Sequence, residues 1–75
     1  MELDLRGLPP AERHPKIFEL FDALPPGKTL TIINDHDPRP LFYQLKAERG
    51  ETFDHERYEV TQEGPGKFVA KLPKR

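Results

Sequence analysis

The sequence predicts a two-layer α/β sandwich in which two helices cover one face of a four-stranded mixed sheet. Three observations predict it: the elements follow the order βαβαββ, apolar residues alternate in the expected strands, and they recur at helical spacing between them. A right-handed crossover makes the first two strands parallel, and a final hairpin adds two antiparallel strands. The chain has 75 residues, which is enough for one domain and too few for a second.

The first strand is indicated by leucines that alternate with charged residues over residues 2–6, and Gly7 ends the pattern. The first helix is expected to begin at Pro15, because proline suits the first helical turn. It is expected to end at Leu24, since the two prolines that follow cannot continue the hydrogen-bond ladder. Its apolar residues at helical spacing are Ile17, Phe18, Leu20, Phe21 and Leu24.

The second strand is expected over residues 28–33, which are rich in β-branched side chains. A polar loop follows over residues 34–37. Asp37 is expected to accept hydrogen bonds from the first amides of a second helix that begins at Pro38. Gly50 stands where a residue in the left-handed conformation would end that helix.

The last third of the chain predicts a hairpin with strands over residues 53–60 and 67–72. Phe53 has the opposite parity to the apolar residues later in its strand, and a β-bulge near His55 is expected to reconcile them. Residues 72–75 are expected to be a frayed, basic tail.

The composition excludes several classes of function. The chain has no cysteine and no serine, so it offers no thiolate, no disulfide and no serine nucleophile. Its 12 basic and 13 acidic residues leave no positive excess for a nucleic acid, which would need the scattered lysines to form one basic face. No apolar run is long enough for a membrane span and no signal peptide is visible, so we expect a cytoplasmic protein. The many charged residues and prolines resemble a thermophile's composition.

The candidate site lies at the edge where the first two strands end, because both predicted helices begin there and their N-termini offer unpaired amides. Arginines at this edge are suited to binding a small anion or a partner's carboxylate. Pairing of Arg6 with Asp35 or Asp37, together with helix capping, would explain the same residues without any ligand. The predicted ligand- or partner-binding residues are Arg6, Arg13, His14, Asp35, His36, Asp37 and Arg39.

A metal centre or an acid-base site is the alternative use of this edge. His14 and His36, with Asp35 or Asp37, would form a set of two histidines and one carboxylate, the kind that binds zinc or non-haem iron. The histidines are 22 residues apart, which matches no zinc-binding motif. His55 is expected to lie far from this edge. No cofactor-binding motif is present, and no cofactor is predicted.

Four segments of the chain resemble a known bacterial family. They read LDLRGLPP at residues 3–10, ERHP at 12–15, FDALPPG at 21–27 and NDHDPRPL at 34–41. Together with Tyr43, Gln44 and Glu48, they resemble the bacterial domain-of-unknown-function family 2249. Members of that family in turn resemble the TusA-like sulfur carriers, which share the βαβαββ fold. The resemblance therefore implies that residues 1–75 form a single TusA-like domain.

The sulfur carriers hold a persulfide on a cysteine at the start of the first helix, in the motif R-G-L-x-C-P. Arg6, Gly7 and Leu8 match this motif, but Pro10 stands where the cysteine would be. Persulfide transfer is therefore excluded for this chain. Carriers of this fold dock partner proteins with the same edge, and relatives of unknown function occur beside hemerythrin-like or redox domains. We therefore expect a non-enzymatic binding or regulatory module whose partner is a protein, such as a hemerythrin-like or redox protein, or a small anion.

Overall fold

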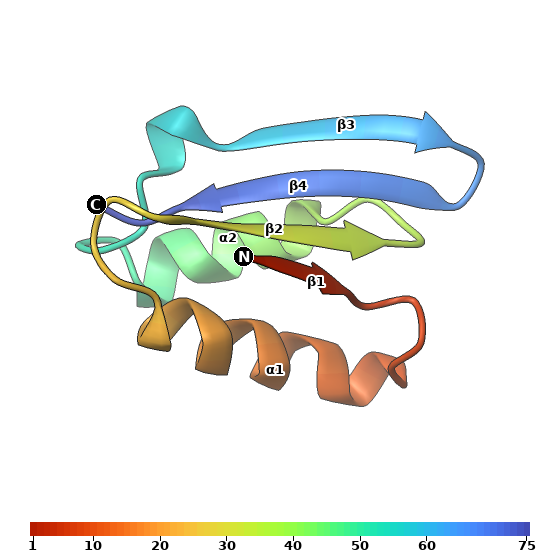
Figure 1. Ribbon diagram of the computed structural model, residues 1–75, viewed down its shortest axis with the longest axis horizontal. Helices are drawn as coiled ribbons and strands as arrows, with labels where there is room; N and C mark the ends of the chain where they lie inside the picture. Colours follow the sequence, from red (N-terminus) through yellow and green to blue (C-terminus); the bar gives the residue numbers. More distant parts are fainter.

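The computed structural model describes all 75 residues and has the predicted order of strands and helices (Figure 1). Four strands form one sheet in the order β1-β2-β4-β3, and two helices pack against one of its faces. The predicted two-layer α/β sandwich is thus confirmed. The elements are β1 (Glu2–Asp4), α1 (Pro10–Ala23), β2 (Thr29–Asn34), α2 (Arg39–Glu48), a 3₁₀ turn (His55–Arg57), β3 (Glu59–Gly64) and β4 (Lys67–Pro73).

The pairing of the strands places one apolar row across the whole sheet. β1 runs parallel to β2, with Leu3 opposite Ile32. β4 is antiparallel to both β2 and β3, and its Ala70 lies opposite Ile32 on one side and Val60 on the other. Side chains on a strand alternate between faces, so this row belongs to the face that the helices cover. The mixed sheet predicted from the sequence is confirmed.

The core lies between that face and the two helices. Phe53 is fully buried, and its ring centroid lies 5.9 Å from that of Phe21 on α1 and 5.8 Å from that of Phe42 on α2. One aromatic side chain therefore joins both helices. The buried apolar residues are Leu5, Ile17, Phe21, Leu24, Leu30, Ile32, Leu41, Leu45, Phe53, Ala70 and Leu72.

The first helix begins at Pro10, so the expectation that it begins at Pro15 is wrong. Pro9 precedes the helix in an extended conformation, and Pro10 supplies the fixed φ that suits a first turn. Pro15 lies inside the helix, where its ring nitrogen cannot donate the usual backbone hydrogen bond. His14 therefore lies on α1 itself and not in the loop before it.

The second helix begins at Arg39, with Pro38 as its N-cap, one residue later than predicted. Gly50 does not adopt the left-handed conformation expected of it, because its φ is not positive. A Cβ atom on Gly50 would instead lie only 2.9 Å from the backbone carbonyl oxygen of Lys46. Glycine is therefore required here by a close approach of the backbone.

The expected strand over residues 53–60 is interrupted. Phe53 forms one isolated bridge with Lys74, a 3₁₀ turn follows over His55–Arg57, and β3 begins only at Glu59. This turn, and not a β-bulge, reconciles the opposite parities of Phe53 and β3. The sheet's irregularity in register lies at the other end of β3, between Gln62 and Gly64.

The C-terminal residues are ordered parts of the sheet, so the expectation of a frayed tail over residues 72–75 is wrong. Leu72 is fully buried and β4 continues through Pro73. Lys74 donates a backbone hydrogen bond to the carbonyl of Lys28 at 2.8 Å, and Arg75 donates one to Thr52 at 2.9 Å. No helix in the structure is both long enough and apolar enough to span a bilayer.

Candidate functional site

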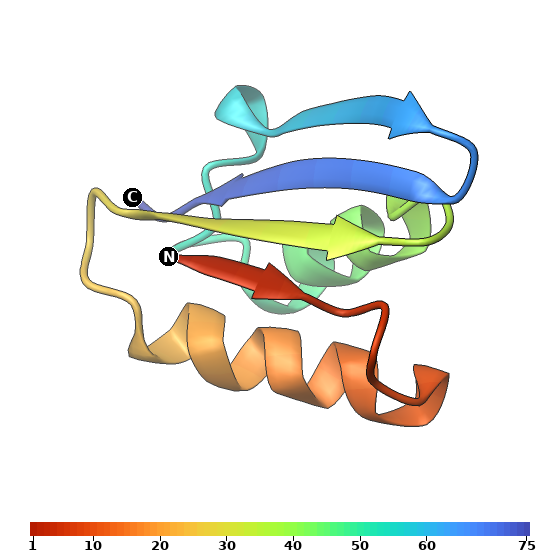
Figure 2. The same ribbon diagram turned by 45° about the vertical axis from the view of Figure 1, so that its right-hand side comes forward.

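The carboxyl ends of β1 and β2 lie side by side, and both helices begin close to them (Figures 1 and 2). The parallel pairing continues past β1, because the amide of Leu5 donates to the carbonyl of Ile33 at 2.8 Å. We call residues 4–9 together with residues 35–39 the loop edge. It is the edge at which the sequence predicted the site.

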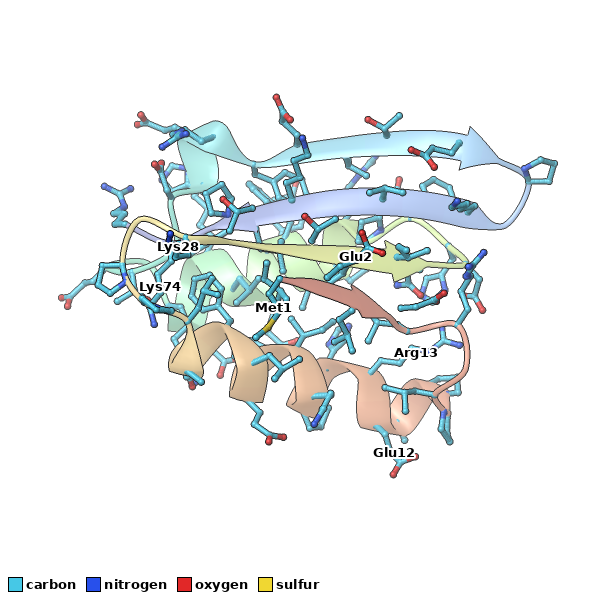
Figure 3. The ribbon with its side chains drawn as sticks, in the orientation of Figure 1. Met1, Glu2, Glu12, Arg13, Lys28 and Lys74 are labelled. Carbon is cyan, nitrogen blue, oxygen red and sulfur yellow. The ribbon has the colours of Figure 1, made fainter.

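Arg13 lies behind the loop edge and joins its two segments (Figure 3). Arg13 as a whole is only 6% exposed to solvent. Its Nη1 donates to Asn34 Oδ1 and to Asp35 Oδ1, both at 2.8 Å, and Nη2 donates to Asp35 Oδ2 at 3.2 Å. Its Nε donates to the carbonyl of Leu8 at 2.9 Å. Arg13 is therefore a structural support of the edge, with its guanidinium committed to protein groups.

His36 is held by the same cluster. Its Nδ1 lies 2.7 Å from Asp35 Oδ1, and its side chain is 65% exposed. A carboxylate only accepts hydrogen bonds, so this geometry places the imidazole proton on Nδ1. The guanidinium of Arg13 and the imidazole of His36 together hold the pKa of Asp35 well below its usual range. The resulting chain from Arg13 through Asp35 fixes the orientation of an exposed imidazole.

The other two arginines of the edge pair with close neighbours in the sequence. Arg6 binds Asp4 with its Nε at 3.0 Å and its Nη2 at 2.8 Å, and these bonds lower the pKa of Asp4 to about 2. The expected pairing of Arg6 with Asp35 or Asp37 is therefore wrong.

Arg39 pairs with Asp37, and its Nη2 lies 3.3 Å from Asp37 Oδ2. The backbone amide of Arg39 also donates to Asp37 Oδ1 at 3.0 Å. Asp37 thus accepts the amide of the first residue of α2, as predicted, although it stands one position before the N-cap.

His14 does not take part in the edge. Its Nδ1 lies 2.8 Å from the side-chain oxygen of Gln44, so it joins α1 to α2. No three histidine, aspartate or glutamate side chains lie close enough together to hold a metal ion. The predicted set of His14, His36 and a carboxylate therefore does not assemble. His55 lies in the 3₁₀ turn that precedes β3.

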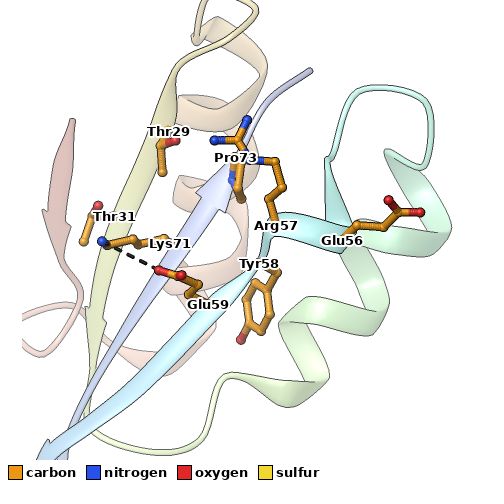
Figure 4. Close-up of a pocket in the computed structure, with 8 residues that line it drawn as sticks. All are labelled: Thr29, Thr31, Glu56, Arg57, Tyr58, Glu59, Lys71 and Pro73. Atoms are coloured by element: carbon orange, nitrogen blue, oxygen red, sulfur yellow. Dashed lines mark ion pairs between the residues drawn. The ribbon is translucent and has the colours of Figure 1, made fainter.

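The centre of the loop edge is not hollowed, and depressions touch the edge only at Leu8, Asp37 and Arg39. Four depressions mark the surface, and Arg6, Arg13, His14, Asp35 and His36 line none of them. The largest, of about 700 Å³, lies where the uncovered face of the sheet meets the 3₁₀ turn, and Lys71 pairs there with Glu59 at 3.7 Å (Figure 4). Its lining residues are Thr29, Thr31, Glu56, Arg57, Tyr58, Glu59, Lys71 and Pro73.

A smaller groove of about 290 Å³ lies between α2 and β3. This groove was not predicted from the sequence, although one pattern indicates it: Phe42 and Tyr43 are adjacent on a helix and cannot both face the core. Tyr43 is 60% exposed. We call this depression the β3 groove, and its residues are Asp37, Arg39, Phe42, Tyr43, Tyr58 and Val60.

Comparison with known proteins gives a family but no activity. An alpha-2-macroglobulin from Xylella fastidiosa is 33% identical over an alignment of 84 positions, and the match covers 95% of this chain and 5% of that protein. The chain thus spans a very small part of that relative's length. No solved structure matches the chain. The family model described as an uncharacterized conserved protein, DUF2249, matches residues 2–74, and the chain belongs to this family.

Proposed function

We propose that this chain is a small docking module and that the loop edge contacts a partner protein. The proposal rests on the exposure and the local bonding of three side chains. Those of Arg6, His36 and Arg39 are 42%, 65% and 71% exposed, and each bonds only to a residue one or two positions away. Such exposed pairs contribute little to folding stability, so the fold does not require these side chains.

The shape of the edge favours a protein over a small anion. A small ligand needs a concave pocket that buries most of its surface, and the loop edge has none of the four depressions at its centre. Arg6 and Arg39 are already neutralised by aspartates, so a free anion would have to compete with them. A protein surface can instead present charges complementary to these arginines and aspartates, and the attraction between the two surfaces would guide their encounter.

The structure behind the edge supports docking by fixing its shape before a partner arrives. Arg13 ties both loop segments to α1 and holds Asp35, which in turn orients His36. Preorganised groups lose less conformational entropy on binding, which raises affinity. The resemblance to the sulfur carriers suggests docking by this edge, and the resemblance to relatives of unknown function adds a partner class, namely a hemerythrin-like or redox protein.

The proposal is tested by photo-cross-linking in the native host cell. A benzophenone amino acid is placed at position 36, and a control chain carries it at position 19, on the exposed side of α1. We expect a protein adduct from position 36 that is absent from position 19. Arg39→Glu should reduce that adduct at least about tenfold while leaving the thermal midpoint unchanged, because reversing one charge opposes a complementary surface.

Two results would contradict protein docking at the edge. Identical adducts from positions 36 and 19 would show non-specific contact. A stoichiometric small molecule seen by native mass spectrometry in the wild type, and lost in His36→Ala, would favour the small-anion ligand instead.

A further inference from the structure

We propose that β3 and the β3 groove bind an extended segment of a partner protein that alternates apolar and basic residues and adds to the sheet as a fifth strand. This surface shares Asp37 and Arg39 with the loop edge, but it does not require binding at the rest of that edge. It rests on the free border of the sheet, the uncovered apolar groove below it, and the charges along β3.

β3 forms one border of the sheet, because β4 is its only neighbour. The strand is six residues long, and its first five residues are exposed. A border strand of this length presents unpaired backbone N–H and C=O groups on its outer side, and these can pair with an added strand. The opposite border, β1, has only three residues and offers much less backbone.

The helices do not cover the inner face of the sheet as far as β3. In the row that crosses the sheet, Ile32 and Ala70 are fully buried, whereas Val60 on β3 is 45% exposed. The β3 groove lies beside Val60. Its aromatic rings pack closely, with centroids 4.6 Å apart for Phe42 and Tyr58, and together with Val60 they give the groove an apolar wall. Apolar side chains of an added strand would fill this groove and be removed from water.

The charges along β3 specify the other face of the added strand. Glu59 and Glu63 are β3's only charged residues, and their side chains are 69% and 48% exposed. Each has one lysine partner, 3.7 Å away for Glu59 and 3.3 Å away for Glu63, and both lysines belong to β4, the strand on the opposite side of β3 from its free border. No other basic side chain lies within 4.0 Å of either carboxylate. Opposite charges on directly paired strands are stabilising, so basic side chains are favoured there.

The same charges argue against a second copy of this chain as the occupant. Two β3 strands paired antiparallel about Thr61 would place Glu59 of one copy opposite Glu63 of the other. Like charges directly opposite each other are destabilising. An acidic border strand of this kind discourages self-association while it remains able to accept a basic strand.

The inference is tested with synthetic peptides and the whole chain. The probe is a seven-residue peptide that alternates lysine and valine. One control has the same composition with the lysines and valines in two blocks, and a second alternates glutamate and valine. We expect the first peptide to shift the backbone amide signals of β3 and the β3 groove in NMR titrations, and to bind at least about tenfold more tightly than either control, a difference set by cross-strand charge and by alternation.

Variants of the chain test where the lysine-valine peptide binds. Val60→Lys should weaken binding of the lysine-valine peptide at least about tenfold, because it places a charge at the groove. The double variant Glu59→Lys/Glu63→Lys should reverse the preference and favour the glutamate-valine peptide. His36→Ala should leave peptide binding unchanged, which separates this surface from the loop edge. Thermal midpoints confirm that each variant is folded.

Three results would overturn the inference. Equal affinities for the lysine-valine and glutamate-valine peptides would remove the role of charge. Equal weakening by His36→Ala and Val60→Lys would move the binding to the loop edge. A concentration-dependent dimer that Val60→Lys abolishes, observed by analytical ultracentrifugation, would make a second copy the occupant.

Discussion

The two ends of the sheet use their charged side chains differently. At the end that holds the C terminus, charged groups join distant parts of the chain. The ammonium group of Lys74 donates to the carbonyls of Phe21 at 3.1 Å and Asp22 at 2.9 Å, and Arg49 binds the carboxylate of Asp22 at 2.7 and 2.9 Å. These bonds tie β4 and the end of α2 to the end of α1. The charges at this end are explained by the fold alone.

At the loop edge the pairs are local. Arg6 binds Asp4 and Arg39 binds Asp37, in each case two positions away, so neither pair joins separate elements. Arg13 is the exception, because its guanidinium reaches Asn34 and Asp35 more than 20 positions along the chain. Charge at the C-terminal end therefore stabilises the fold, whereas most charge at the loop edge joins no distant parts of the chain, and we propose that it serves recognition.

The largest expected effect tests the C-terminal end. Phe53→Ala should lower the free energy of unfolding by about 3 to 5 kcal/mol, because it leaves a cavity where both helices meet the sheet. Urea denaturation measures the change. Tyr43→Ala is the matched control, since Tyr43 is 60% exposed, and it should cost less than about 1 kcal/mol. Equal losses would show that Phe53 is not the centre of the packing.

The next largest effect is expected from Arg13, whose guanidinium joins distant parts of the chain at the loop edge. Arg13→Met keeps the aliphatic stem but removes the hydrogen bonds to Leu8, Asn34 and Asp35. We expect the thermal midpoint to fall by on the order of 10 °C, since a small domain is sensitive to the loss of several bonds at once. Calorimetry measures the midpoint. A fall no larger than that caused by Arg6→Ala would show that Arg13, like Arg6, contributes little to the stability of the fold.

Lowering the pH should remove part of the folding stability that the pairing of Arg13 with Asp35 contributes. Asp35 has a lower pKa in the folded chain than in the unfolded chain, where a value of about 3.9 is usual, so the folded state binds fewer protons. The stability that this provides is present above about pH 4 and is lost as pH falls toward the folded pKa. The difference in thermal midpoint between wild type and Arg13→Met should therefore shrink to roughly half between pH 6 and pH 2. A difference that stays constant across this range would contradict the assigned role of Asp35.

The sequence predicts those parts of the fold in which one local pattern decides the outcome. Alternation places Leu72 and Ala70 on one face of β4, and the structure buries both. Both strands that lead to the loop edge, and the meeting of their ends, follow from the same patterns. The 3₁₀ turn over His55–Arg57 has no such pattern, because it is set by the burial of Phe53 against two helices.

The candidate site is predictable in position but not in detail. Sequence places Arg13 and Arg39 at the same edge, because each stands near a helix start. It does not show that one is 7% and the other 71% exposed in its side chain. That difference depends on partners that only the folded chain brings together, such as Asn34 and Asp35 for Arg13. The order of the C-terminal residues could not be predicted for the same reason, since the side chain of Lys74 bonds to a carbonyl of α1 that only folding brings near.

A smaller effect is expected from Lys74→Ala at the C-terminal end. The ammonium group donates to two carbonyls at the end of α1, those of Phe21 and Asp22, and lies 5.4 Å from the ring centroid of Phe21. Its removal should lower the free energy of unfolding by about 1 kcal/mol, measured by urea denaturation. Lys28→Ala serves as the control, because the backbone carbonyl of Lys28, and not its side chain, is used by the tail. An equal loss in the control would contradict a specific role for the Lys74 ammonium.

The smallest effect on stability, and the most informative for function, is expected from Arg39→Ala. Its pair with Asp37 is exposed and local, so the thermal midpoint should change by no more than about 2 °C. The same variant should reduce cross-linking of a partner from position 36, since it removes a cation from the loop edge, which we propose contacts the partner. A variant that loses the partner while keeping its stability separates the two uses of charge, and Arg13→Met cannot do so because it loosens the whole edge. If Arg39→Ala instead lowers the midpoint as much as Lys74→Ala, the local pair supports the fold, and the contrast between the two ends of the sheet no longer holds.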